Sequence, residues 1–89
     1  MIIKTLTIIN KLGLHARAAA KLASTCSRFS SRVQIGFNGK MVDGKSIMSL
    51  MLLAAAQGSE IELAVDGEDE DEAAKTITQL VNERFGEDE

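Results

Sequence analysis

The sequence predicts an α+β fold, an open-faced βαββαβα sandwich in which three helices cover one face of a four-stranded antiparallel sheet. Segments with an apolar residue at every second position, typical of strands, are interspersed with segments whose apolar residues recur every three or four positions, typical of helices. The links are short, and each predicted strand is apolar on one side only. Both features favour antiparallel pairing with one face of the sheet left open.

The first half of the chain predicts a strand, a helix and a hairpin. Residues 2–9 alternate as a strand, residues 10–13 form a turn, and residues 16–29 form a helix. The helix has an apolar face made by Ala19, Leu22, Cys26 and Phe29. Residues 33–37 alternate again, and the Asn38-Gly39 pair that follows is typical of a two-residue hairpin turn. The returning strand, residues 40–43, then places Val42 opposite Ile35.

The second half predicts a helix, a strand and a final helix. Ser46 is the expected N-cap of a helix over residues 47–54, with Gly58 as the residue that ends it. Residues 60–66 alternate as the fourth strand. Gly67 then opens the last helix, and Gly86 ends it. The first turn of this helix holds the five acidic residues 68–72, which interact favourably with the helix dipole. The expected core face of that helix consists of Ala73, Ile77, Leu80, Val81 and Phe85.

Composition excludes several classes of function. The 89 residues are expected to form one domain spanning residues 1–89. A formal net charge of −3 without Trp or Tyr argues against nucleic-acid binding. The N-terminus resembles neither a signal peptide nor a membrane span, so we expect a cytoplasmic protein. One histidine and one cysteine cannot build a metal site, and no cofactor is expected.

The stretch GKMVDGKS, residues 39–46, fits the phosphate-loop pattern of nucleotide hydrolases. Two observations argue against that function. The chain is too short for the several βαβ units that such an enzyme needs. The Asn38-Gly39 turn also assigns Gly39 to a hairpin, which leaves no loop around a phosphate.

His15, in the stretch GLHARAAAKL, comes directly before the first predicted helix. One interpretation is a solvent-facing histidine near a helix start. The other is a phosphoryl acceptor, because backbone N–H groups and the dipole at a helix N-terminus favour a phosphate there. The guanidinium of Arg17 lies close enough in sequence to reach the phosphoryl oxygens.

Four motifs together resemble the HPr phosphocarrier family of the bacterial phosphoenolpyruvate-dependent phosphotransferase system. They are GLHAR as the active-site loop, NGK as the hairpin, KSIMSLM at the second helix, and GSEIELAVDGEDEDEA at the last strand and helix. The resemblance covers nearly the whole chain and implies the same βαββαβα fold. It also implies that His15 takes a phosphoryl group from enzyme I and passes it to a histidine of an enzyme IIA. The backbone N–H groups of Ala16 and Arg17 and the Arg17 side chain would hold that group, and the protein would be a carrier, not an enzyme.

The resemblance implies two further sites. Ser46 matches the serine that a bifunctional HPr kinase/phosphorylase modifies in some bacteria, and Ile47, Met48 and Met51 match an apolar patch that docks partners. A carrier of this kind is expected to be a monomer. The alternative is a regulatory binding module that works through Ser46 without phosphotransfer, and His15 argues against it.

The chain departs from many relatives at two positions near His15. Ala18 stands where proline is common, which restores an N–H but gives up a pre-set φ in the first helical turn. Leu12 replaces a small polar residue, so no side chain at that position can orient the histidine ring by a hydrogen bond.

Overall fold

A computed structural model describes all residues, 1–89, and contains the predicted elements in the predicted order. They are β1 (Ile2–Thr7), α1 (Ala16–Ser27), β2 (Arg32–Phe37), β3 (Lys40–Asp43), α2 (Ile47–Leu53), β4 (Glu60–Asp66), α3 (Glu70–Asn82) and a 3₁₀ turn, η1 (Arg84–Gly86). The strands form one antiparallel sheet in the order β1-β4-β2-β3. The predicted α+β sandwich is therefore confirmed.

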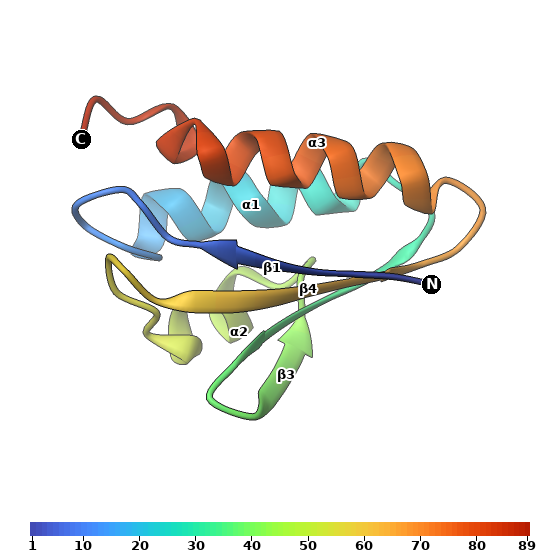
Figure 1. Ribbon diagram of the computed structural model, residues 1–89, viewed down its shortest axis with the longest axis horizontal. Helices are drawn as coiled ribbons and strands as arrows, with labels where there is room; N and C mark the ends of the chain where they lie inside the picture. Colours follow the sequence, from blue (N-terminus) through green and yellow to red (C-terminus); the bar gives the residue numbers. More distant parts are fainter.

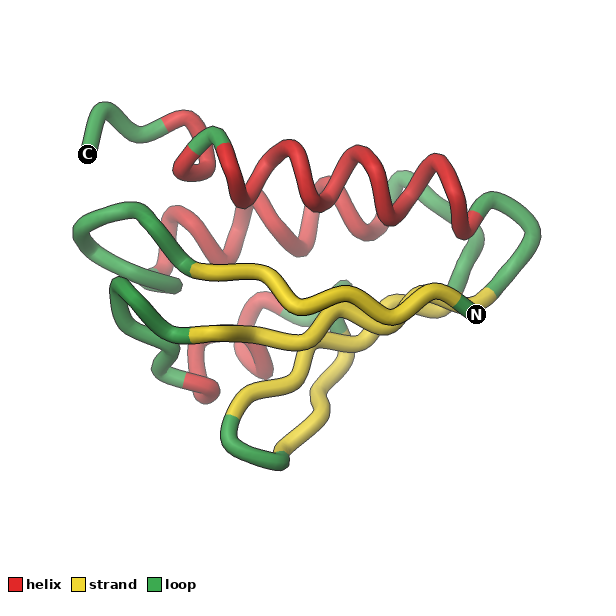
Figure 2. The backbone as a smooth tube through the Cα atoms, viewed as in Figure 1, coloured by secondary structure: helices red, strands yellow, loops and turns green.

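The helices and the sheet form two layers around one core. The long helices α1 and α3 run side by side along one face of the sheet (Figures 1 and 2). The short helix α2 packs against α1 and against the β2–β3 hairpin. Alternate strand residues point into this layer, and the buried ones are Leu6, Val33, Ile35, Ile61, Leu63 and Val65. The opposite face of the sheet carries no helix (Figure 1), which explains why each strand is apolar on one side only.

The β2–β3 hairpin is confirmed as predicted. Asn38 and Gly39 both have positive φ, 53° and 79°, and Ile35 pairs with Val42. The residues of the phosphate-loop pattern therefore lie in an extended strand and a helix start. Lys45, the lysine of that pattern, donates from Nζ to the carbonyl of Phe29 at 2.9 Å. The segment contains no cradle for a nucleotide phosphate.

The second helix ends one residue before its predicted end, and Gly58 is not the residue that ends it. α2 stops at Leu53, and Ala54 turns the chain out of the helix with a φ of 54°. The carbonyl of Ala55 instead accepts a hydrogen bond of 2.9 Å from the backbone N–H of Leu14, and Ala55 is buried. A tertiary contact with the loop before α1 therefore ends the helix before Gly58 is reached.

The predicted start of the last helix is also wrong. α3 begins at Glu70 with Asp69 as its N-cap residue, and the Asp69 side chain contacts a different part of the chain instead of capping the helix. Its carboxylate accepts 2.9 Å hydrogen bonds from the backbone N–H groups of Ser30 and Ser31, and also a hydrogen bond from the Ser31 hydroxyl. Asp69 thereby connects the α1–β2 loop to the start of α3.

Other boundaries differ by smaller amounts. β1 ends at Thr7 and α1 at Ser27, two residues earlier than predicted in each case. Phe85 is fully buried, as expected of the core, but it lies in η1 after α3 with a φ of 55°. This left-handed turn directs the last residues away from the axis of α3 and back toward the β1–α1 loop.

The Asp69 contacts predict an acid-dependent stability. These hydrogen bonds, first the one from the Ser31 hydroxyl, lower the pKa of Asp69 from 3.8 to about 2. A lowered carboxyl pKa contributes stability above the unfolded value, and this contribution is lost as the pH falls from 3.8 through about 2. Asp69→Asn should lower the melting temperature at about pH 7, and its difference from the unchanged protein should shrink below about pH 4 and vanish only below about pH 2.

Thermal unfolding followed by circular dichroism from neutral to acid pH measures this difference. Asp71→Asn is the matched control, because Asp71 is exposed in the first turn of α3 and makes no side-chain hydrogen bond. An Asp69→Asn curve that stays parallel to the control at every pH would contradict the assignment.

Candidate functional site

His15 is the N-cap residue of α1, at the end of the loop that follows β1. Its carbonyl accepts the first helical hydrogen bond, from Ala19 at 2.8 Å, and its side chain is 27% exposed. The N–H groups of Ala16, Arg17 and Ala18 make no hydrogen bond within the chain. The structure thus places the histidine and a set of free donors together, and Arg17 lines the same groove as His15.

A residue that the sequence analysis missed contacts His15. Oε2 of Glu87 lies 2.5 Å from Nε2 of His15, and Oε1 accepts a 2.9 Å hydrogen bond from the side-chain amide of Asn10. The same Asn10 amide donates to the carbonyl of Gly13 at 2.8 Å. One carboxylate therefore joins the C-terminal tail to the loop that carries the histidine.

The Glu87 carboxylate is held as an anion. Its pKa is lowered, chiefly by the Asn10 hydrogen bond and further by the contact with His15 and the charge of Arg17, although partial burial opposes the shift. Asn10 itself is fully buried. An ionised carboxylate can only accept hydrogen bonds, and this fixes the direction of both contacts.

The tail that carries Glu87 is fixed along its length. Phe85 is buried in the core, and its carbonyl accepts a 2.8 Å hydrogen bond from Nζ of Lys21. The carbonyl of Glu89 accepts a hydrogen bond from the backbone N–H of Lys11. The side chains of the same two residues form an ion pair, with Nζ of Lys11 3.4 Å from Oε2 of Glu89. Figure 1 shows the tail beside the β1–α1 loop, and a groove of about 820 Å³ lies between them.

The other side of the loop is held by the segment after α2. Gly13 has a φ of 69°, and a Cβ built on it would lie 2.7 Å from the carbonyl oxygen of Ala55. The neighbouring Leu14 donates to that same oxygen. This close approach requires glycine, and it fixes the loop relative to α2.

Helix α2 has two faces, as its sequence suggested. Leu50 and Leu53 are buried in the core. The exposed apolar side chains are Ile47, Met48 at 70% exposure, Met51 and Leu52. We call these four residues the α2 patch. Leu52 was not predicted to be part of this patch. A short helix that is apolar all round does not show in its sequence which residues face outward.

Ser46 caps α2 as predicted. Its hydroxyl oxygen accepts a 3.2 Å hydrogen bond from the backbone N–H of Ser49, and its own backbone is extended. The residue is partly exposed, next to Ile47 of the α2 patch.

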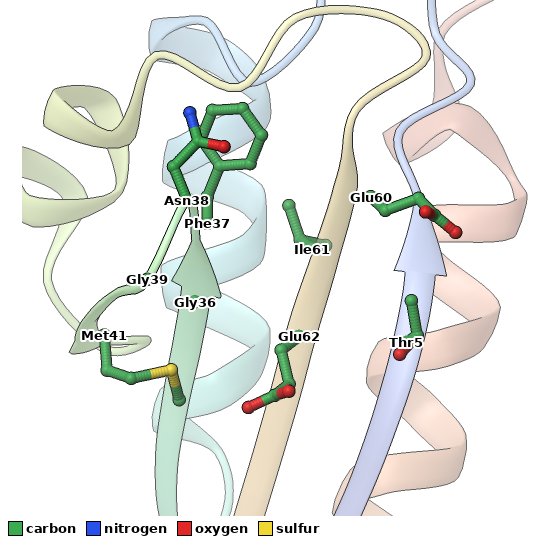
Figure 3. A pocket seen from close by; sticks show the side chains of 9 residues that line it. All are labelled: Thr5, Gly36, Phe37, Asn38, Gly39, Met41, Glu60, Ile61 and Glu62. Carbon is green, nitrogen blue, oxygen red and sulfur yellow. The ribbon is translucent and has the colours of Figure 1, made fainter.

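Two other features of the molecule do not suit phosphate chemistry. A hollow of about 370 Å³ lies on the open face of the sheet, where Met41 extends across Gly36 (Figure 3). Its charged lining residues are Glu60 and Glu62, which would repel a phosphate. Burial raises the pKa of the Cys26 thiol to about 12, which keeps it protonated and unreactive.

The structure contains neither a cluster of metal-ligand side chains nor a helix that could span a membrane. No three histidine, cysteine or acidic side chains lie close enough together to hold a metal ion. None of the helices has the length and apolar character needed to cross a bilayer.

Comparisons with known proteins agree with the resemblance noted from the motifs. The family model described as "PTS HPr component phosphorylation site" matches residues 2–83. The phosphocarrier protein HPr of Neisseria meningitidis serogroup A is 54% identical, and that of Cupriavidus necator is 52% identical, each over 89 residues and all of both chains. A crystal structure of HPr from Thermoanaerobacter tengcongensis superposes with a TM-score of 0.96 at 43% identity, covering all of both chains. The chain therefore belongs to the HPr family of phosphocarrier proteins of the phosphotransferase system.

Proposed function

We propose that this protein carries a phosphoryl group on His15, taking it from the phosphohistidine of enzyme I and giving it to a histidine of an enzyme IIA. The observation that carries the proposal is the position of His15 at the N-terminus of α1, beside three free backbone N–H groups, in a chain of the HPr family. In this role the protein is a substrate of other phosphotransferases and catalyses no reaction of its own.

The geometry favours Nδ1 of His15 as the acceptor atom. Nε2 is held by the carboxylate of Glu87, so the neutral ring presents its lone pair at Nδ1. The N–H groups of Ala16 and Arg17 can donate to the phosphoryl oxygens, and the positive end of the α1 dipole favours their charge. The guanidinium of Arg17 adds charge-assisted hydrogen bonds.

The α2 patch is the proposed docking surface for both partners. It lies next to the active-site loop, since the segment after α2 is hydrogen-bonded to Leu14. Contiguous exposed apolar side chains commonly mark a protein interface, and flexible methionines can adapt to more than one partner. The patch thus allows one face to serve donor and acceptor in turn.

Ser46 is the proposed site of regulatory phosphorylation by an HPr kinase/phosphorylase. A phosphate there would add about −1.5 to −2 charges at the start of α2, which the helix dipole tolerates. The charge would stand beside the α2 patch and disfavour partners that offer acidic or apolar surface.

Phosphoryl transfer from phosphoenolpyruvate through enzyme I tests the proposal. The unchanged protein should acquire an acid-labile phosphate, and His15→Ala should acquire none. Arg17→Ala should be labelled roughly tenfold to a hundredfold more slowly, because it loses charge-assisted hydrogen bonds to the phosphoryl group. Labelling is measured by mass spectrometry before and after acid treatment.

Arg28→Ala is the matched control for Arg17→Ala, because Arg28 is an exposed arginine at the other end of α1. It should be labelled at the normal rate. Labelling that persists in His15→Ala would overturn the carrier role. Modification at Ser46 without any labelling of His15 would instead support a regulatory binding module.

Two substitutions at Ser46 separate capping from charge. Ser46→Ala should lower the free energy of unfolding by about 1 kcal/mol, because the N-cap hydrogen bond is lost, whereas Ser46→Asp should keep the cap. Ser46→Asp should slow labelling by enzyme I, since it places a negative charge beside the α2 patch, and Ser46→Ala should not. Chemical denaturation and initial labelling rates measure the two effects, and equal slowing by both substitutions would argue against the charge mechanism.

A further inference from the structure

We infer that Glu87 is a positioning residue for phosphoryl transfer: it holds the proton on Nε2 of His15, so that Nδ1 carries the lone pair that attacks phosphorus. This inference rests on the proposed carrier function and deepens it. It assigns a part of the active site to the C-terminal tail, outside the loop and helix that the active-site motif covers.

Hydrogen-bond directions around Glu87 leave one consistent arrangement. The side-chain nitrogen of Asn10 donates to the carbonyl of Gly13, which can only accept, so the atom that Asn10 presents to Glu87 is also a donor. Glu87 meets this donor with one oxygen and His15 with the other. A carboxylate oxygen 2.5 Å from a ring nitrogen requires a proton between them. In the neutral ring that proton is on Nε2.

The position of Glu87 is set independently of His15. Phe85, two residues earlier, is fully buried, and Lys21 holds its carbonyl. Lys11 holds the carbonyl of Glu89, two residues later. The Glu87 side chain is only 13% exposed between these anchors. A carboxylate fixed in this way can orient the ring and also select its tautomer.

The transfer step balances with this proton in place. The Nδ1 lone pair forms a bond to phosphorus, while the bond between phosphorus and the donor's imidazole breaks and its electron pair returns to the donor nitrogen. The His15 ring becomes cationic, and its proton stays on Nε2, facing the carboxylate of Glu87. In onward transfer the same proton draws electrons from the Nδ1–P bond, which makes the ring a better leaving group.

Glu87→Gln provides a sharp test because it reverses one hydrogen bond. The glutamine oxygen must face the Asn10 donor, so its NH₂ group faces His15 and favours a ring with a free Nε2 and the proton on Nδ1. That tautomer has no lone pair at Nδ1. Glu87→Ala removes the contact without imposing either tautomer. Glutamine, the more conservative substitution, should therefore be the more damaging one.

The experiment combines two readouts. Long-range ¹H–¹⁵N correlation spectra at about pH 8, where an ordinary imidazole is neutral, should show the proton on Nε2 in the unchanged protein and on Nδ1 in Glu87→Gln. Single-turnover phosphorylation by phospho-enzyme I should be slowed roughly tenfold or more in Glu87→Gln, as expected for a wrong tautomer, and less in Glu87→Ala. Asp88→Asn is the matched control, because Asp88 is an adjacent tail carboxylate that makes no hydrogen bond through its side chain.

If the Glu87 contact only held the tail in place, Glu87→Ala would be phosphorylated more slowly than Glu87→Gln, and the proton would stay on Nε2 in Glu87→Gln. Either result would overturn the inference. The spectra report on the ring without any transfer, so they judge the Glu87 contact even if the carrier role fails. Absence of labelling in the unchanged protein would refute the carrier role, whereas normal labelling with the opposite order of variants would refute only the role of Glu87.

Discussion

The buried amide of Asn10 holds together the chain segments on which the site depends. Its nitrogen closes the β1–α1 loop through Gly13 and joins that loop to the C-terminal tail through Glu87. Hydrogen bonds of this kind contribute about 1 kcal/mol each, but leaving a buried donor unpaired costs about 1–3 kcal/mol. Asn10 is fully buried and its amide nitrogen makes both of these hydrogen bonds, so a rearrangement of the side chain would leave buried donors unpaired.

The fold supplies His15 with three supports that are distant from one another in sequence. The first is α1, which provides free N–H groups after His15. The second is the segment after α2, whose Ala55 carbonyl binds the loop at Leu14 and thereby fixes the α2 patch beside it. The third is the tail, which the buried Phe85 directs back over the loop. A carrier needs this combination, because the ring must be oriented while one side stays open to successive partners.

The local sequence pattern was enough to predict the fold class and the position of His15 at the start of α1. Alternation, helical spacing and the Asn38-Gly39 turn depend on near neighbours, and so does the cap at Ser46. The failures arose where a distant contact decided the outcome. The carbonyl of Ala55 binds Leu14 before the chain reaches Gly58, the residue expected to end the helix, and Asp69, the N-cap residue of α3, uses its side chain to bind the α1–β2 loop.

Glu87 was missed for the same reason, since nothing local distinguishes it from the other acids of the tail. The most direct test of the account is to identify the ring nitrogen that carries phosphorus in the ¹⁵N-histidine-labelled, phosphorylated protein. The account predicts ³¹P–¹⁵N coupling to Nδ1 of His15, with the proton retained on Nε2 toward Glu87. Coupling to Nε2 would contradict it, because the phosphoryl group would then occupy the position that the structure gives to the carboxylate.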